Sequence, residues 1–245
     1  MLAILNKEIQ SFFSSLTGYL VIGLFLVACG LFLFVFTGSY NILDSGFADL
    51  KSFFNLAPWI FIFLIPAISM KSFADEKRMG TMELLLTKPI SLWKLILGKY
   101  LGILFLVTLA IAPTLLYIFT ISELGRPVGN FDVGATIGSY LGLIFLGACY
   151  AAVGIFSSSL SSNQIVSFLL GVFLCFISYF AFEALSQTNI FGNSSYILES
   201  FGISFHYKSI SRGVIDTRDI IYFLSLIFLF LKLTEIKLSG NKTRR

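Results

Sequence analysis

The chain carries little charge for its length. Of its 245 residues only 12% are Asp, Glu, Lys or Arg, whereas 57% are hydrophobic. Soluble proteins average about 25% charged and roughly 45–50% apolar residues. The mean hydropathy of +0.90 points the same way. This composition cannot supply the polar shell of a water-soluble protein, so it predicts an integral membrane protein.

Histidine and cysteine are scarce, and neither stands in a metal-binding pattern. The single histidine, His206, has no HExxH partner and no neighbouring cysteine, which zinc sites of that kind require. We interpret it as an ordinary loop or interface residue. Cys29, Cys149 and Cys175 fall inside apolar runs without a CxxC spacing. We expect them to be small buried side chains of helices, and we predict no disulfide and no metal site.

Signatures of catalysis and of nucleotide binding are also missing. No GxSxG segment is present, so a hydrolase nucleophile is not indicated. Gly98-Lys99 is followed by Tyr100, and Trp93 stands where a phosphate-binding loop needs its first glycine. The net charge of +4 does not point to nucleic acid. We predict no enzyme activity and no cofactor in this chain, so any energy source must come from another polypeptide.

The centres of the apolar runs lack Asp, Glu, Lys and Arg. Intramembrane charges mark ion and proton pathways because they are costly in lipid. An intramembrane protease would also need a buried ionisable pair, and we expect none. Glu183, Lys232 and Glu235 lie near the ends of runs, where snorkelling to the interface explains them. The sequence therefore disfavours an ion-coupled carrier.

Six apolar runs are long enough to cross a bilayer, which takes about 20 residues. They lie near 18–36, 56–73, 92–118, 137–157, 165–185 and 220–236. Residues 2–16 place apolar side chains on one helical face and polar ones on the other, which predicts an amphipathic helix in the interface before the first span. The alternative is an ordinary extension of that span into water. No linker or repeat is evident, so residues 1–245 are expected to form one all-α domain.

The distribution of basic residues predicts the orientation. With both termini in the cytoplasm, twelve of the 17 Lys and Arg residues fall on the cytoplasmic side, as the positive-inside rule requires. Six spans are consistent with two cytoplasmic termini. The outer loop 186–219 mixes apolar and polar residues, and either a fold back into the outer leaflet or a packed surface loop fits it.

The longest charged island lies between the second and third spans, at about residues 74–91. Gly80 allows a bend there because glycine tolerates backbone angles that other residues avoid. Thr81 can cap a new short helix with Glu83 in its first turn, and Pro89 can end that helix. We expect a short cytoplasmic helix that is presented to a soluble partner. The alternative is a solvated charged loop that contacts nothing.

Three segments, taken together, resemble the ABC-2 type permeases. The first resembles the E-x-x-x-G-T-x-E-x-L-L loop of that family. The second, 156–164, is similar to its S-S-L-T-x-N-Q turn, with Ser161 in place of the threonine. The third, 209–223, resembles its R-G-V-I-D-x-R-D segment, and the gliding-motility branch of the family is the nearest in pattern. The residues that carry these resemblances are Glu76, Arg78, Gly80, Thr81, Glu83, Leu84, Leu85 and Leu86; Ser158, Asn163 and Gln164; and Arg212, Gly213, Asp216 and Asp219.

The resemblance implies a permease of the bacterial cytoplasmic (inner) membrane that pairs with a second permease, identical or different. Two cytosolic ABC ATPases would bind ATP and Mg. The segment from Gly80 to Leu86 would be the coupling helix, seated in a groove of the ATPase. Leu84, Leu85 and Leu86 would form its apolar knob, and Glu76, Arg78 and Glu83 would pair across the rim. The second and third motifs receive no role.

Three functions follow from these patterns. The first is the transmembrane subunit of an exporting ABC transporter, in gliding motility or envelope secretion. The second is a channel or secondary carrier that works alone, which the missing intramembrane charges disfavour. The third is a scaffold that anchors an ATPase and transmits force.

Overall fold

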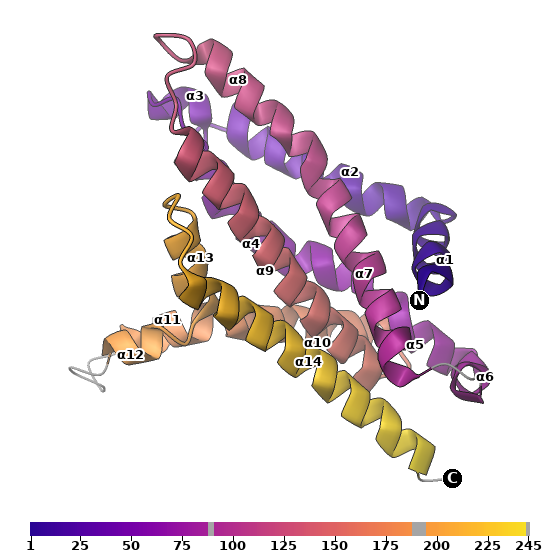
Figure 1. Cartoon of the computed structure of the whole chain (residues 1–245). Helices are drawn as coiled ribbons and strands as arrows, with labels where there is room; N and C mark the ends of the chain where they lie inside the picture. Colours follow the sequence, from indigo (N-terminus) through magenta and orange to yellow (C-terminus); the bar gives the residue numbers. More distant parts are fainter. Residues whose placement is uncertain (88–90, 188–194, 244–245) are drawn as a thin grey trace.

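The computed structural model describes residues 1–87, 91–187 and 195–243, and within these ranges every regular element is a helix. The predicted all-α fold is therefore confirmed (Figure 1). In chain order the elements are α1 Leu2–Phe13, α2 Leu16–Gly30, the π-helical η1 Leu31–Val35, α3 Ile42–Ser45, α4 Lys51–Ser69, α5 Lys71–Arg78, α6 Thr81–Thr87, α7 Leu92–Ile111, the 3-10 segment η2 Ala112–Leu115, α8 Leu116–Leu124, α9 Val133–Leu160, α10 Gln164–Phe176, the π-helical η3 Ile177–Ala181, α11 Phe182–Ser186, α12 Ser195–Glu199, α13 Ile203–Ile210 and α14 Thr217–Thr243.

Five helical stretches in the described residues are long and apolar enough to cross a membrane: Gly18–Val35, Lys51–Arg78, Leu92–Leu124, Val133–Leu160 and Gln164–Ser186. They overlap the first five predicted spans, and the second extends to Arg78, into the segment 74–91 that was predicted to be a cytoplasmic loop. The sixth prediction, 220–236, falls inside α14, which is long enough but carries charges toward both ends, at Arg218, Asp219, Lys232, Glu235 and Lys237. The sixth span and the orientation stay predictions.

Helix α9 is the centre of the bundle, and α4, α7, α10, α13 and α14 all pack against it. Small residues make this possible because they let helix backbones approach closely. A Cβ added to Gly147 would lie 2.8 Å from Val107 of α7, and one added to Gly154 would lie 2.1 Å from the Ser69 hydroxyl of α4. At these positions glycine is what allows α9 to contact two neighbours.

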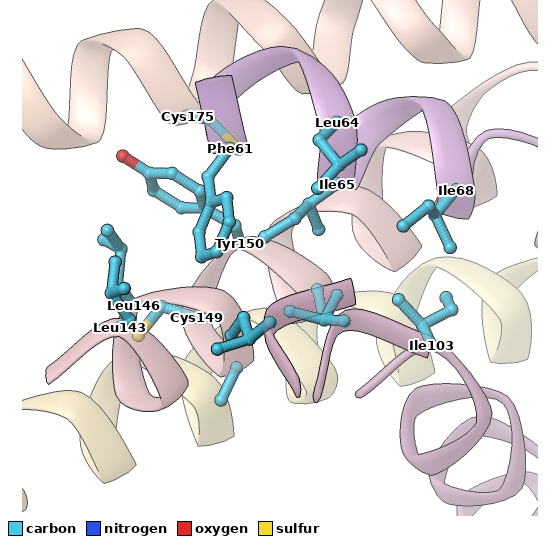
Figure 2. Close-up of a cluster of buried hydrophobic side chains, with 14 of the residues drawn as sticks. Phe61, Leu64, Ile65, Ile68, Ile103, Leu143, Leu146, Cys149, Tyr150 and Cys175 are labelled. Atoms are coloured by element: carbon cyan, nitrogen blue, oxygen red, sulfur yellow. The ribbon is translucent and has the colours of Figure 1, made fainter. Parts of the chain in front are cut away.

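The core around α9 is apolar and includes the cysteines. Figure 2 shows Phe61 and Ile65 of α4 facing Leu146, Cys149 and Tyr150 of α9. All three cysteines are free and buried. The prediction that they are small buried side chains of helices is confirmed.

Helix α1 has the predicted amphipathic character. Ile4, Phe12 and Phe13 pack against the core cluster, whereas Asn6 and Gln10 are exposed. The outer-loop prediction is resolved in part, because α13 is packed against α9 and α14 with Ile203, Tyr207 and Ile210 buried. Residues 188–194 of that loop lie outside the described residues.

Candidate coupling site

The predicted bend and short helix are both present. Helix α5 ends at Arg78, Gly80 adopts a left-handed conformation with φ of 69°, and α6 begins at Thr81. The Thr81 hydroxyl donates to the carbonyl of Glu76 at 3.3 Å and so ties α6 back to α5. Glu83 lies in the first turn of α6, as predicted. The charged island is therefore an ordered helical elbow, and Pro89 lies outside the described residues.

Ser158 of α9 holds the junction between α4 and α5. Its hydroxyl accepts hydrogen bonds from the backbone N–H groups of Phe73 at 2.9 Å and Ala74 at 3.1 Å. The same hydroxyl donates to the carbonyl of Met70 at 2.9 Å. These backbone groups lie where one helix gives way to the next, and an unpaired backbone group inside a protein is costly. Ser158 satisfies them and fixes α5 to α9.

Two further contacts join α5 to the turn between α9 and α10. The Gln164 amide donates to the carboxylate of Asp75, and the Lys77 ammonium donates to the Ser159 carbonyl at the end of α9. Asn163 caps α10, because its side-chain oxygen accepts the N–H of Ile165 at 2.9 Å. The first two sequence motifs, about 80 residues apart in the chain, therefore meet at one site.

A buried ionic network lies on the other side of α5. The ammonium of Lys99, which is 1% exposed, contacts Glu8 at 2.6 Å and Glu76 at 3.0 Å. It also donates to the carbonyl of Ser72 at 2.7 Å. Lys7 contacts the same Glu76 oxygen at 3.0 Å. The network links α1, α5 and α7 through charge-assisted hydrogen bonds, which are stronger than neutral ones.

Two glycines of α7 bring α1 close enough for this network. A Cβ on Gly98 would lie 3.0 Å from the Ile4 side chain, and one on Gly102 would lie 3.0 Å from the Cβ of Glu8. Small residues four apart on one helix face are typical of close helix contacts in membranes. The ring of Phe73 lies 5.0 Å from the Lys99 ammonium and adds a cation–π contact. Lys99, Gly98 and Gly102 thus form the surface of α7 against which α1 packs.

The network corrects two predictions. The prediction that the buried part of the bundle holds no ionisable pair is wrong, because Lys99 lies inside α7 between the carboxylates of Glu8 and Glu76. Glu76 was expected at the exposed rim of the coupling helix, but its side chain is only 6% exposed and it pairs within the chain. Its second oxygen, Oε2, is buried and has no partner among the described residues.

The other predicted coupling residues are more accessible. The Arg78 side chain is 63% exposed and lies 3.6 Å from Asp75. Glu83 is exposed and Leu85 is half-buried. The side chains of Leu84 and Leu86 are outside the described part of the structure. Met82, which the sequence did not single out, is 7% exposed and anchors α6 to the core.

The third motif lies at the other end of the bundle, beside α13. Gly213 has φ of 86°, and a Cβ there would lie 2.9 Å from the backbone of α9. The Asp216 carboxylate accepts the N–H of Arg218 at 2.9 Å and caps α14. Arg212 is exposed. Ser139 of α9 contacts Ser211 of the third motif. Ser139 and Ser158 are separated by roughly 28 Å at 1.5 Å per helical residue, so the third motif does not join the first two.

Asp219 pairs with His206, a contact that was not predicted from the sequence. Its carboxylate lies 2.6 Å from Nδ1 of His206, and Nε2 of His206 is 2.8 Å from the Ser200 carbonyl. His206 is 9% exposed and stacks on Tyr222, with ring centroids 3.8 Å apart. The interpretation of His206 as an ordinary loop or interface residue was wrong. The pair fixes α13 to α14. Both ring nitrogens contact other groups, the Asp219 carboxylate and the Ser200 carbonyl, and neither contacts a serine hydroxyl as in a Ser–His dyad.

Comparison with known families gives one match over most of the chain. A family model described as "ABC-2 family transporter protein" matches residues 2–227. No curated protein matches the chain. The matched range includes α1, the elbow, the α9–α10 turn and the first part of α14.

Proposed function

Because the chain belongs to the ABC-2 transporter family, we propose that it is the transmembrane permease subunit of an ATP-driven exporter and that α6 is its coupling helix. Membership of the family implies association with the membrane and with an ABC ATPase. Such permeases are in general not catalytic. ATP and Mg would be bound by the ATPase partner, and a second permease would complete the complex.

The observation that carries this proposal is the way the elbow is built into the bundle. Helix α6 leaves α5 at a glycine turn. Met79, which caps the end of α5, is 62% exposed, and Glu83 of α6 is also exposed. Helix α5 is fixed by polar contacts to α9 on one side and to α7 and α1 on the other. A solvated loop that contacts nothing would not need these polar contacts. A helix that transmits force from a partner to the spans must be fixed to them in this way. A push on α6 would move several spans together, which is a rigid-body conversion.

The orientation and setting are part of the proposal. Six spans with both termini in the cytoplasm are supported by the position of α1 beside α5 and by the end of α14, where Lys237 lies close enough to Lys77 to interact electrostatically. The basic residues favour the same side for the cytoplasm. Together with the motif pattern, this supports a bacterial inner-membrane permease acting in gliding motility.

Purification from native membranes in mild detergent tests the coupling role. We expect mass spectrometry to identify an ABC ATPase with the wild-type chain. We expect the double variant Leu84→Asp and Leu85→Asp to stay in the membrane but to lose that ATPase, because two carboxylates cannot be buried in an apolar groove.

Ile197→Asp is a matched control. Ile197 is 59% exposed on the short helix α12, so its replacement should leave the ATPase bound. Recovery of the ATPase with the α6 variant would refute the coupling role. A wild-type chain that purifies alone and supports ATP-independent flux in vesicles would favour a channel or carrier instead.

A further inference from the structure

A cavity of about 910 Å³ opens at the end of the bundle opposite α6. Its lining comes from residues 42–54, which lead from α3 into α4, and from residues 121–136, which connect α8 to α9 (Figure 1). Ser139 and Ser211 complete it, and the Ser139 hydroxyl donates to the Ser211 carbonyl at 3.0 Å. The volume is within the range of small-molecule sites, roughly 300–1,000 Å³.

The cavity lies where three candidate spans reach the membrane surface. One span begins at Lys51, one ends at Leu124 and one begins at Val133, and the lining residues cluster around these three positions. Span ends lie at the boundary between the hydrocarbon core and the headgroup region of a bilayer. The cavity is therefore at the depth of lipid head groups.

Its walls combine exposed apolar side chains with charged ones, and most of the charged side chains already have a partner within the chain. Leu43, Phe47 and Leu124 are 57%, 76% and 56% exposed. Among the charged lining residues, Asp49 pairs with Lys51 at 3.3 Å. Asp132 accepts the N–H of Ala135 at 2.9 Å and caps α9, where the helix dipole favours its negative charge.

Arg126 is the remaining charged residue of the lining. It is exposed, and no carboxylate in the described ranges lies within ion-pair distance of it. A guanidinium forms two parallel hydrogen bonds with a phosphate, which makes arginine well suited to phosphate recognition. The cavity thus offers one cation without an ionic partner next to an exposed apolar surface.

We propose that this cavity binds a membrane phospholipid with an anionic head group. The phosphate contacts Arg126, and the acyl chains lie over Phe47, Leu43 and Leu124. The site is distinct from the coupling site at α6 and does not depend on it, so the proposed function and the lipid site stand or fall separately.

Native mass spectrometry of the purified full chain in a neutral detergent tests this site. We expect phosphatidylglycerol to bind more tightly than phosphatidylcholine with the same acyl chains. Arg126→Gln should weaken phosphatidylglycerol binding by about tenfold, the loss expected for one charged hydrogen bond. Phe47→Asp should weaken it too, because it places a carboxylate on the apolar wall. Both positions are exposed, so the variants should fold.

Arg218→Gln is the matched control, since Arg218 is exposed like Arg126 but lies at the start of α14 and does not line the cavity. It should bind phosphatidylglycerol like the wild type. Equal binding of the two lipids, or unchanged binding by Arg126→Gln, would overturn the proposal. Displacement of the lipid by millimolar inorganic phosphate would also overturn it, because the site would then take a free anion.

Discussion

At the scale of single residues, Lys99 shows how a charge is kept inside an apolar bundle. An ammonium group has three N–H donors, and Lys99 directs them at Glu8, Glu76 and the Ser72 carbonyl. The cost of removing an ion from water is several kcal/mol even after relaxation. The charge is tolerated because every donor is used and two carboxylates surround it.

Replacement of Lys99 by methionine should therefore be strongly destabilising. The variant keeps the length and apolar volume of the side chain but removes the cation that Glu8 and Glu76 share. Glu8 then loses its ionic partner, and the buried Glu76 keeps only the exposed Lys7 as a partner. Breaking a buried pair by removing one partner costs about 3–5 kcal/mol. Thermal unfolding of the detergent-purified chain should show a large loss of stability.

Lys94→Met provides the comparison, because Lys94 is exposed one turn earlier on the same helix. It should unfold close to the wild-type temperature. Adding Glu8→Gln and Glu76→Gln to Lys99→Met should restore part of the stability, since no uncompensated buried charge remains. Equal stability of Lys99→Met and Lys94→Met would show that the network does not stabilise the fold.

The sequence pointed to some of these residues but not to their pairing. Composition and run length were sufficient to recognise a membrane bundle, and Gly80 was sufficient to predict the elbow. Glu8 and Lys99 are 91 positions apart, and nothing local to either predicts their contact. Gly98 and Gly102, spaced for a helix contact, were the available signal. His206 was missed for the same reason, because its partner Asp219 is reached only once α13 folds against α14.

At the scale of elements, α5 connects the elbow to the rest of the bundle. It follows α4 with only Met70 between them, so backbone N–H and C=O groups at the junction need hydrogen-bond partners from outside the two helices. Ser158 provides them from α9, and that contact explains why the serine-rich turn motif lies beside the elbow. The lengths of the apolar runs predicted the positions of five long helical stretches in the described residues. They did not decide whether α14 crosses the membrane. The charges near its ends are those expected of a helix that emerges from the membrane.

Ser158→Ala tests the junction. It removes the acceptor of the Phe73 and Ala74 N–H groups, and leaving a buried group unsatisfied costs about 1–3 kcal/mol. We expect a lower unfolding temperature and faster hydrogen exchange of these two amides. Ser159→Ala is the neighbouring control, because among the described residues the Ser159 hydroxyl donates only to the Phe156 carbonyl of its own helix. Similar exchange in both variants would count against a role for Ser158 at the junction.

At the scale of the whole molecule, α1, α5 and α7 are joined to one another by direct contacts. Glycine contacts seat α1 on α7, and Lys99 with Glu76 joins both to α5. If α6 receives force from an ATPase, these three helices move as a unit, and α1 does not slide on α7 during the cycle. The family match alone does not predict this, because it depends on contacts between segments far apart in the chain.

A disulfide between positions 4 and 98 tests whether α1 and α7 stay together. A Cβ at Gly98 lies 3.0 Å from the Cβ of Ile4, and disulfides join Cβ atoms about 3.8 Å apart, so a small shift suffices. We expect Ile4→Cys with Gly98→Cys to cross-link under mild oxidation, as detected by loss of maleimide labelling. ATP hydrolysis by the purified complex should be the same before and after addition of a reductant. Each single cysteine variant controls for the substitutions themselves. Hydrolysis that is lost on cross-linking and regained on reduction would show that α1 moves against α7 in the cycle, and failure to cross-link would refute the contact itself.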